Sequence, residues 1–237
     1  MPSSSGAVTV GRVILPASVA VENPWLSWGY VESNWDDLAR LTGQHVSLTV
    51  QAVLIALAIA LPLALLARAR PAVAGALLGT SAVLYTVPSL ALFGLLAPFT
   101  GIGRTTVLIG LVAYAMLVLV RNILVGLQGV PHDVVDAARG MGYSGGRRLL
   151  AVELPLALPA IITGVRLATV TTVALVTVGV VVGYGGLGQL MFRGFSSSYR
   201  AEIMTATLLC LAIALVADVV LLALGRALAP WSRRRVA

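Results

Sequence analysis

Five long apolar stretches, separated by short polar segments, constrain the fold of this chain more than any other feature. They cover approximately 46–66, 72–96, 105–125, 157–182 and 203–224. Each has about the length that an α-helix needs to cross a bilayer, roughly twenty residues. Hydrophobic residues make up 59% of the chain and charged residues 11%, whereas soluble domains are far richer in charge. We therefore expect an all-α integral membrane protein with five transmembrane helices.

The first 44 residues do not follow this pattern. The apolar run VTVGRVILPASVAV is broken by Arg12 and Pro16, and several aromatic residues then lie among polar ones. Such a composition is typical of an interfacial segment with an aromatic belt. The start MPSSSG lacks the basic residues of a cleavable signal peptide, and a sixth span within this segment stays open. We expect an external or interfacial segment at 1–44, a transmembrane domain at 45–226 and a basic cytoplasmic tail at 227–237.

The arginines indicate the orientation of the spans. All 16 basic residues are arginine, and most lie beside apolar runs, where topology and anionic lipid explain them better than a nucleic-acid partner does. With the N-terminus outside, the cytoplasmic side receives Arg68, Arg70, Arg121, Arg139, Arg147, Arg148, Arg226, Arg233, Arg234 and Arg235. The outer loops receive only Arg104, Arg193 and Arg200. This bias predicts an outside N-terminus and an inside C-terminus.

The longest cytoplasmic loop, about 129–155, contains its own helical signals. Pro131 and Asp133 favour a helix start, and glycines end that helix before Ser144 opens a second segment. We expect two short helices joined by a glycine turn. Ala137 and Ala138 would give the first helix a slim face that fits a groove on another protein. An amphipathic loop resting on lipid headgroups is the alternative, and the spacing alone does not separate the two.

This loop resembles the EAA motif of ABC-importer permeases, which reads E-A-A, three residues, G, nine residues, I-x-L-P. The chain has Asp136-Ala137-Ala138, then Gly142, then VELP at 152–155 at the same spacing, with Asp in place of Glu and Val in place of Ile. The resemblance implies a coupling helix that sits in a cleft of a cytoplasmic ATPase. The residues it assigns to this contact are Asp136, Ala137, Ala138, Gly140, Gly142, Glu153, Leu154 and Pro155.

Further stretches narrow the resemblance to permeases of glycine betaine, carnitine and choline importers. They are QHVSLT, TVPSLALFGLLAPFTGIG, LVRNILVGL, VELPLALPAIITGVRLAT and GYGGLGQLMFRG, which together span most of the chain from Gln44 onward. The resemblance implies the five-helix, MetI-like core of type I ABC importers in a bacterial plasma or inner membrane. It also implies ATPase subunits, a second permease copy or paralogue, and an external substrate-binding protein. The cargo would be an osmoprotectant, but which one stays open.

The chain itself has no recognisable catalytic apparatus. It contains no lysine, so it cannot form the Walker A sequence that cradles phosphate; ATP and Mg are expected on a separate ATPase subunit, and no cofactor on this chain. His45 and His132 are expected at opposite membrane edges, which predicts no metal site. A secondary transporter or channel is the alternative function, although the mid-membrane relays and inverted repeats typical of that class are not evident.

Two groups of residues inside the spans are candidates for specific roles. Tyr85, Pro88 and Ser89 indicate a bent or interrupted span, which is tolerated chiefly where backbone lines a cavity or packs against protein. Tyr114 and Tyr184, with Tyr85, have ring faces that suit a quaternary ammonium, although helix packing is their commoner use. Arg166 and Asp218 lie at similar depths in spans four and five. We predict that these two form a structural ion pair, the alternative being an arginine that snorkels to the membrane edge.

Overall fold

The structure is a computed structural model that describes residues 23–231. The apolar run at 8–21, on which a sixth span would depend, lies outside the described residues. So do Arg233, Arg234 and Arg235 of the basic tail. The expectations for these two segments stay predictions.

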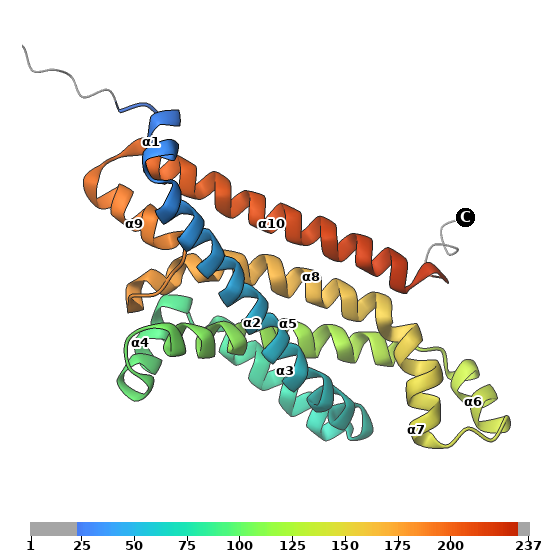
Figure 1. Ribbon diagram of the computed structural model, residues 1–237. Coiled ribbons are helices and arrows are strands. Elements are labelled where there is room, and N and C mark those ends of the chain that lie inside the picture. Colours follow the sequence, from blue (N-terminus) through green and yellow to red (C-terminus); the bar gives the residue numbers. More distant parts are fainter. Residues whose placement is uncertain (1–22, 232–237) are drawn as a thin grey trace, which may run out of the picture.

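All regular structure within residues 23–231 is helical, which confirms the predicted all-α class (Figure 1). The elements are α1 (Trp28–Ser33), α2 (Trp35–Ala69), α3 (Pro71–Thr86), α4 (Ser89–Thr100), α5 (Arg104–Gln128), α6 (His132–Gly140), α7 (Gly145–Arg148), a π-helical turn η1 (Leu149–Glu153), α8 (Leu154–Val178), a 3-10 turn η2 (Gly179–Val182), α9 (Gly188–Ser197) and α10 (Arg200–Leu228).

Four helical segments of the described chain are long and apolar enough to cross a membrane: Trp35–Arg68, Arg104–Gln128, Gly145–Val182 and Arg200–Leu228. The pair α3 and α4 supplies a fifth crossing only if the two bent helices count as one span. The helix α2 begins well before the apolar run at 46, with Asp36 and Asp37 in its first turn, where acidic side chains complement the helix dipole. The predicted division at residue 44 therefore falls inside a helix.

The centre of the molecule is the packing of α5 against α2 and α8. Small residues allow these helices to approach closely. On α2, Ala52, Ala56, Ala60 and Ala64 recur every fourth residue and are fully buried. Between α5 and α8, a Cβ atom on Gly164 would lie 2.5 Å from the Cβ of Asn122. Small residues at helix contacts are the usual way that membrane helices pack, since lipid provides little hydrophobic drive for their association.

The short helices gather at the two ends of the long ones (Figure 1). We call the end with α6 and α7 the coupling end, and the end with α1 and α9 the opposite end. The helix α10 packs along α8 and also contacts α9, α1 and α2. The candidate residues are thus divided between the two ends, the bent pair α3–α4 with its neighbour α5, and the contact of α8 with α10.

Candidate functional site

The helix α6 ends in a turn that requires a glycine. Gly142 has φ +78°, a left-handed conformation that residues with a Cβ rarely adopt. Its N–H donates to the carbonyl of Arg139 at 2.9 Å, and the N–H of Tyr143 donates to the carbonyl of Ala138 at 3.1 Å. This is the hydrogen-bond pattern of a Schellman C-cap. The glycine of the motif therefore sets the direction in which the chain leaves α6 toward α7.

The two alanines of the motif differ in exposure, so only one of them is available to the predicted docking face. Ala138 is 1% exposed, and α6 packs against α7 and η1, so this alanine faces the chain itself. Ala137 is exposed, together with Val134 and Met141. The positions 134, 137 and 141 follow helical spacing and form one apolar stripe on the outer face of α6. We call these three residues the α6 stripe.

Glu153, assigned by the resemblance to the ATPase contact, is instead a buried anchor. Its residue exposure is 0%. Arg148 donates to its Oε1 at 2.8 Å, and Arg68 in the last turn of α2 forms an ion pair with its Oε2. Leu154 and Pro155 are half-buried where α8 begins. A carboxylate with no access to solvent cannot meet a partner subunit, so Glu153 ties the coupling segment to α2.

A π-helical turn connects this anchor to α8. The N–H of Leu154 donates to the carbonyl of Leu149, five residues back, and Pro155 follows directly. Proline has no N–H, and its ring clashes with the carbonyl four residues earlier in a regular α-helix. A wider turn accommodates both features. The segment Gly145–Val182 consequently runs as one continuous helical element from the coupling end into the bilayer.

The bend expected at Pro88 and Ser89 is present. The axes of 72–86 and 89–100 differ by 99°. The hydroxyl of Tyr114 on α5 donates a hydrogen bond to the carbonyl of Val87 at the break, and the rings of Tyr85 and Tyr114 meet edge to face with centroids 6.3 Å apart. Irregular backbone at membrane depth needs such partners for its free polar groups. Tyr114 therefore stabilises the bend.

The candidate path residues do not form one site. A cavity of about 630 Å³ opens between α3, α5 and α8, with Tyr85 in its wall. Tyr184 is half-buried elsewhere, packed against the cluster of Leu48, Phe93 and Val107. The residues lining the cavity are Leu78, Ser81, Ala82, Tyr85, Leu117, Val118, Arg121, Asn122, Val125 and Leu167. Of the five residues named from the sequence, the structure thus brings only Tyr85 to this cavity.

Arg166 and Asp218 form the ion pair expected between α8 and α10. The guanidinium is bidentate: Nε donates to Oδ1 at 2.9 Å and an NH2 nitrogen donates to Oδ2 at 2.8 Å. Paired donors of this kind suit the planar arginine fork. The pair joins two spans and takes no part in the cavity described above.

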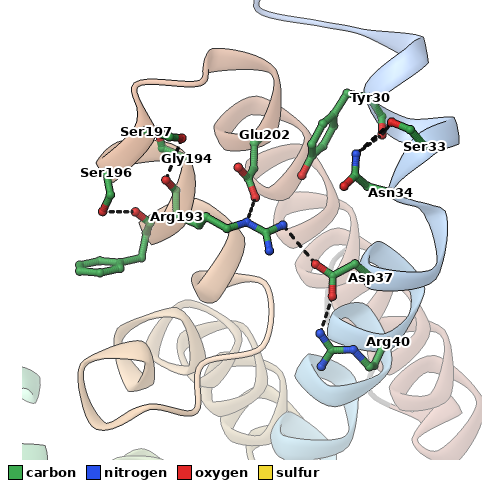
Figure 2. Close-up of polar contacts among 11 residues, drawn as sticks. Tyr30, Ser33, Asn34, Asp37, Arg40, Arg193, Gly194, Ser196, Ser197 and Glu202 are labelled. Atoms are coloured by element: carbon green, nitrogen blue, oxygen red, sulfur yellow. Dashed lines mark hydrogen bonds and ion pairs between the residues drawn. The ribbon is translucent and has the colours of Figure 1, made fainter.

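A charged cluster at the opposite end was not predicted (Figure 2). Arg193 of α9 donates to Glu202 of α10 and, at 3.1 Å, to Asp37 of α2. Tyr30 is buried beside them, and this burial, together with the charge of Glu202, raises its pKa to about 12. The cluster joins the neighbouring helices α9 and α10 to α2, whose Asp37 is 156 residues away from Arg193 in the sequence.

His45, expected at a membrane edge, is packed between helices. Its ring is fully buried, and Nε2 lies 3.0 Å from the carbonyl oxygen of Val173 on α8. A Cβ on Gly186 would lie 2.8 Å from the Cβ of His45, so the YGGLG turn packs directly over this histidine. Within residues 23–231, no cluster of three or more His, Cys, Asp or Glu side chains suits a metal ion. His45 therefore contributes to helix packing, and its expected place at a membrane edge stays a prediction.

Comparison with known proteins explains this arrangement of helices. Residues 40–234 match the sequence family described as the inner membrane component of binding-protein-dependent transport systems. The chain belongs to this family. It is a multi-pass membrane protein, and the transport class and location expected from the coupling segment are confirmed.

Curated relatives cover most of the chain. The carnitine transport permease OpuCB of Listeria monocytogenes is 34% identical over 197 residues, which is 83% of this chain and 89% of that protein. The osmoprotectant import permease OsmW of Salmonella typhimurium is 38% identical over 195 residues, covering 80% and 90%. The glycine betaine/carnitine/choline permease OpuCB of Bacillus subtilis is 29% identical over 201 residues, covering 85% and 93%.

The fold is also found among solved structures. A chain of the MetNI methionine ABC transporter in an inward-facing conformation matches with a TM-score of 0.74 and 23% sequence identity, over 83% of this chain and 98% of that chain. The predicted MetI-like importer-permease fold is thereby confirmed. The orientation of the helices in the membrane stays a prediction.

Proposed function

We propose that this chain is the permease subunit of an ABC importer that carries a small quaternary amine such as glycine betaine, carnitine or choline. The observation that carries the proposal is the extent of the permease relatives, which are 34% and 38% identical over at least 80% of the chain and are named for carnitine and osmoprotectant transport. The cavity beside the bent span, with an exposed tyrosine ring in its wall, is chemically compatible with a quaternary ammonium.

In this proposal a separate ATPase supplies the energy. The α6 stripe is the exposed apolar part of the coupling segment and would contact it beside the exposed Asp136, Gly140 and Gly142, whereas Ala138 and Glu153 are turned inward. Movement of α6 would reach α2 through Glu153 and Arg68, and would reach α8 through the continuous helix after η1. A second permease subunit and an external binding protein complete the assembly. ATP and Mg would be held by the ATPase, with no cofactor on this chain.

Uptake by the purified assembly in liposomes tests the proposal. The chain is co-expressed with its ATPase and supplied with binding protein, and uptake of labelled glycine betaine, carnitine and choline is followed with ATP, with a non-hydrolysable ATP analogue, or with an imposed ion gradient alone. We expect uptake of at least one quaternary amine that requires both hydrolysable ATP and binding protein. Uptake driven by the ion gradient alone would instead establish a secondary transporter. Failure to carry any quaternary amine, with ATP-driven uptake of another solute, would remove the cargo assignment.

A further inference from the structure

Arg121 lies within the membrane-spanning part of α5 rather than in a loop. The sequence prediction grouped it with the cytoplasmic arginines. Gln128 ends the helix, seven residues later, which places Arg121 about 10 Å inside that end at 1.5 Å per residue. The side chain is exposed and lines the cavity with Tyr85 and Asn122. A charged group at this depth is costly in hydrocarbon and is expected to face protein or water.

The guanidinium of Arg121 has no anionic partner in the part of the chain that the structure describes. No hydrogen bond or ion pair joins its side chain to another residue between 23 and 231. Arg166, the other arginine well inside a span, is by contrast bidentate to Asp218. The wall of the cavity contributes hydroxyl, amide and apolar groups but no carboxylate.

Residues 23–231 of a second copy offer no unpaired acidic side chain inside a span either. The acidic residues of the long helices are already paired: Asp37 and Glu202 with Arg193, Glu153 with Arg68, and Asp218 with Arg166. The other acidic residues that the structure describes lie in α1, at the start of α2 or in α6, and are Glu32, Asp36, Asp133 and Asp136. None of these belongs to the interior of a span. Among the residues that the structure describes, no acidic side chain inside a span is therefore left over to pair with Arg121, and the position is open to an anionic group of a bound molecule.

The surroundings of Arg121 suit a small molecule that carries both a positively charged ammonium group and a negatively charged carboxylate. Tyr114 and Arg121 are seven residues apart and so lie on the same face of α5, about two turns from each other. Tyr85 packs on the Tyr114 ring and is 58% exposed, so an aromatic surface lies toward one end of the cavity. Ring faces attract an ammonium group, and a guanidinium fork binds a carboxylate through two hydrogen bonds.

We propose that Arg121 binds the carboxylate of a zwitterionic cargo in this cavity, so that the permease itself favours betaine-type osmolytes over choline, which has no carboxylate. The inference rests on the proposed importer function and names the class of cargo at its path. Choline would meet an unpaired positive charge at the position where a betaine forms an ion pair. Selection would then occur twice, in the binding protein and again within the membrane.

The test uses the reconstituted assembly with glycine betaine and choline as labelled cargoes. Uptake by Arg121→Gln, Arg121→Lys and the control Arg70→Gln is divided by the wild-type rate for each cargo, which cancels the preference of the binding protein. Arg70 is exposed between α2 and α3. Its replacement removes one positive charge near the coupling end but outside the cavity, and so serves as the control. ATPase stimulation by loaded binding protein is measured in parallel.

We expect Arg121→Gln to lower betaine uptake by about tenfold, the effect of losing one charged hydrogen-bonded contact, and to leave choline uptake unchanged or raised. Arg121→Lys should be intermediate, since lysine keeps the charge but not the fork. Unchanged betaine uptake in Arg121→Gln would overturn the inference. So would an equal fall for both cargoes per inserted protein in Arg121→Gln and Arg121→Lys; if the amount of inserted protein falls as well, Arg121 only anchors a lipid phosphate. A wild-type assembly that carries neither cargo would reject the proposed cargo class itself, and the inference with it.

Discussion

Arg68, in the last turn of α2, forms an ion pair with the fully buried Glu153 just before α8. Arg148 completes the arrangement from the other side of the carboxylate. A single negative charge thus holds two guanidinium groups, one from a spanning helix and one from the coupling segment. The coupling helices therefore have a fixed connection to the rest of the molecule rather than a flexible tether.

Replacing Glu153 with Gln should destabilise the protein strongly. The change keeps the shape of the side chain but leaves Arg68 and Arg148 side by side without an anion. Breaking a buried pair costs about 3 to 5 kcal/mol, so we expect a marked fall in the thermal unfolding midpoint in detergent. Asp136→Asn is the matched control, because its side chain is 68% exposed and its partner Arg139 is also at the surface. Equal midpoints for the two variants would show that the buried anchor does not stabilise the fold.

The sequence pattern was sufficient to predict local features of the fold, but not features that depend on how the helices pack. Apolar length predicted the spanning helices, and the VPS stretch predicted the bend at Pro88, because both are local properties of the chain. The inward side of Ala138 was not predictable, since it depends on how α6 packs against η1. The same holds for Glu153 and Arg68, which are 85 residues apart in the chain and meet only after α2 and α8 have packed.

The cluster around Arg193 illustrates the same limit at the opposite end. Arg193 was expected in an outer loop, and Asp37 and Glu202 were not singled out from the sequence, because nothing local pairs the three residues. Matched depth was enough to pair Arg166 with Asp218 because both lie well inside spans, where few other partners exist. Near the membrane edge many polar groups are available as ion-pair partners, and the position of a residue along the chain does not show which of them it meets.

The Arg166–Asp218 pair makes a prediction about coupled substitutions. Arg166→Gln or Asp218→Asn alone leaves one charge without its bidentate partner and should lower the yield of folded protein. The double variant should lose less than the sum of the two single losses, because no unpaired charge remains. The measurement is the monodisperse fraction in gel filtration after mild heating. Strictly additive losses would mean that each residue acts through other contacts.

Labelling of single cysteines tests the predicted orientation. Cys210 is the only cysteine of the chain, so Cys210→Ser provides a thiol-free background. Cysteines at Ile102 and Ser197 should react with a membrane-impermeant maleimide in intact cells, whereas a cysteine at Arg70 should react only after the membrane is permeabilised. The arginine bias of the loops is the physical reason. Labelling at Arg70 in intact cells, with none at Ser197, would reverse the topology.

The exposed α6 stripe leads to a prediction about the ATPase contact. Ala137→Trp places a large ring on the outer face of α6 without disturbing its inner packing, because Ala137 is exposed. If this face sits in a groove of the ATPase, the added volume should prevent close contact. Uptake should then be abolished and ATPase co-purification reduced, although the chain inserts normally. If α6 instead rests on lipid headgroups, an interfacial helix accepts a tryptophan readily and both values should stay near wild type.

Two companion variants separate docking from folding in this experiment. Ala138→Trp inserts the same ring on the buried side of α6, where Ala138 is 1% exposed, and should disturb the coupling segment itself and lower its resistance to proteolysis. Asp133→Asn changes an exposed residue of the same helix outside the α6 stripe and should leave uptake largely intact. Loss of uptake in Ala137→Trp with wild-type proteolysis therefore assigns the defect to the contact with the ATPase. Normal uptake and normal co-purification in that variant would contradict a docking role for the α6 stripe.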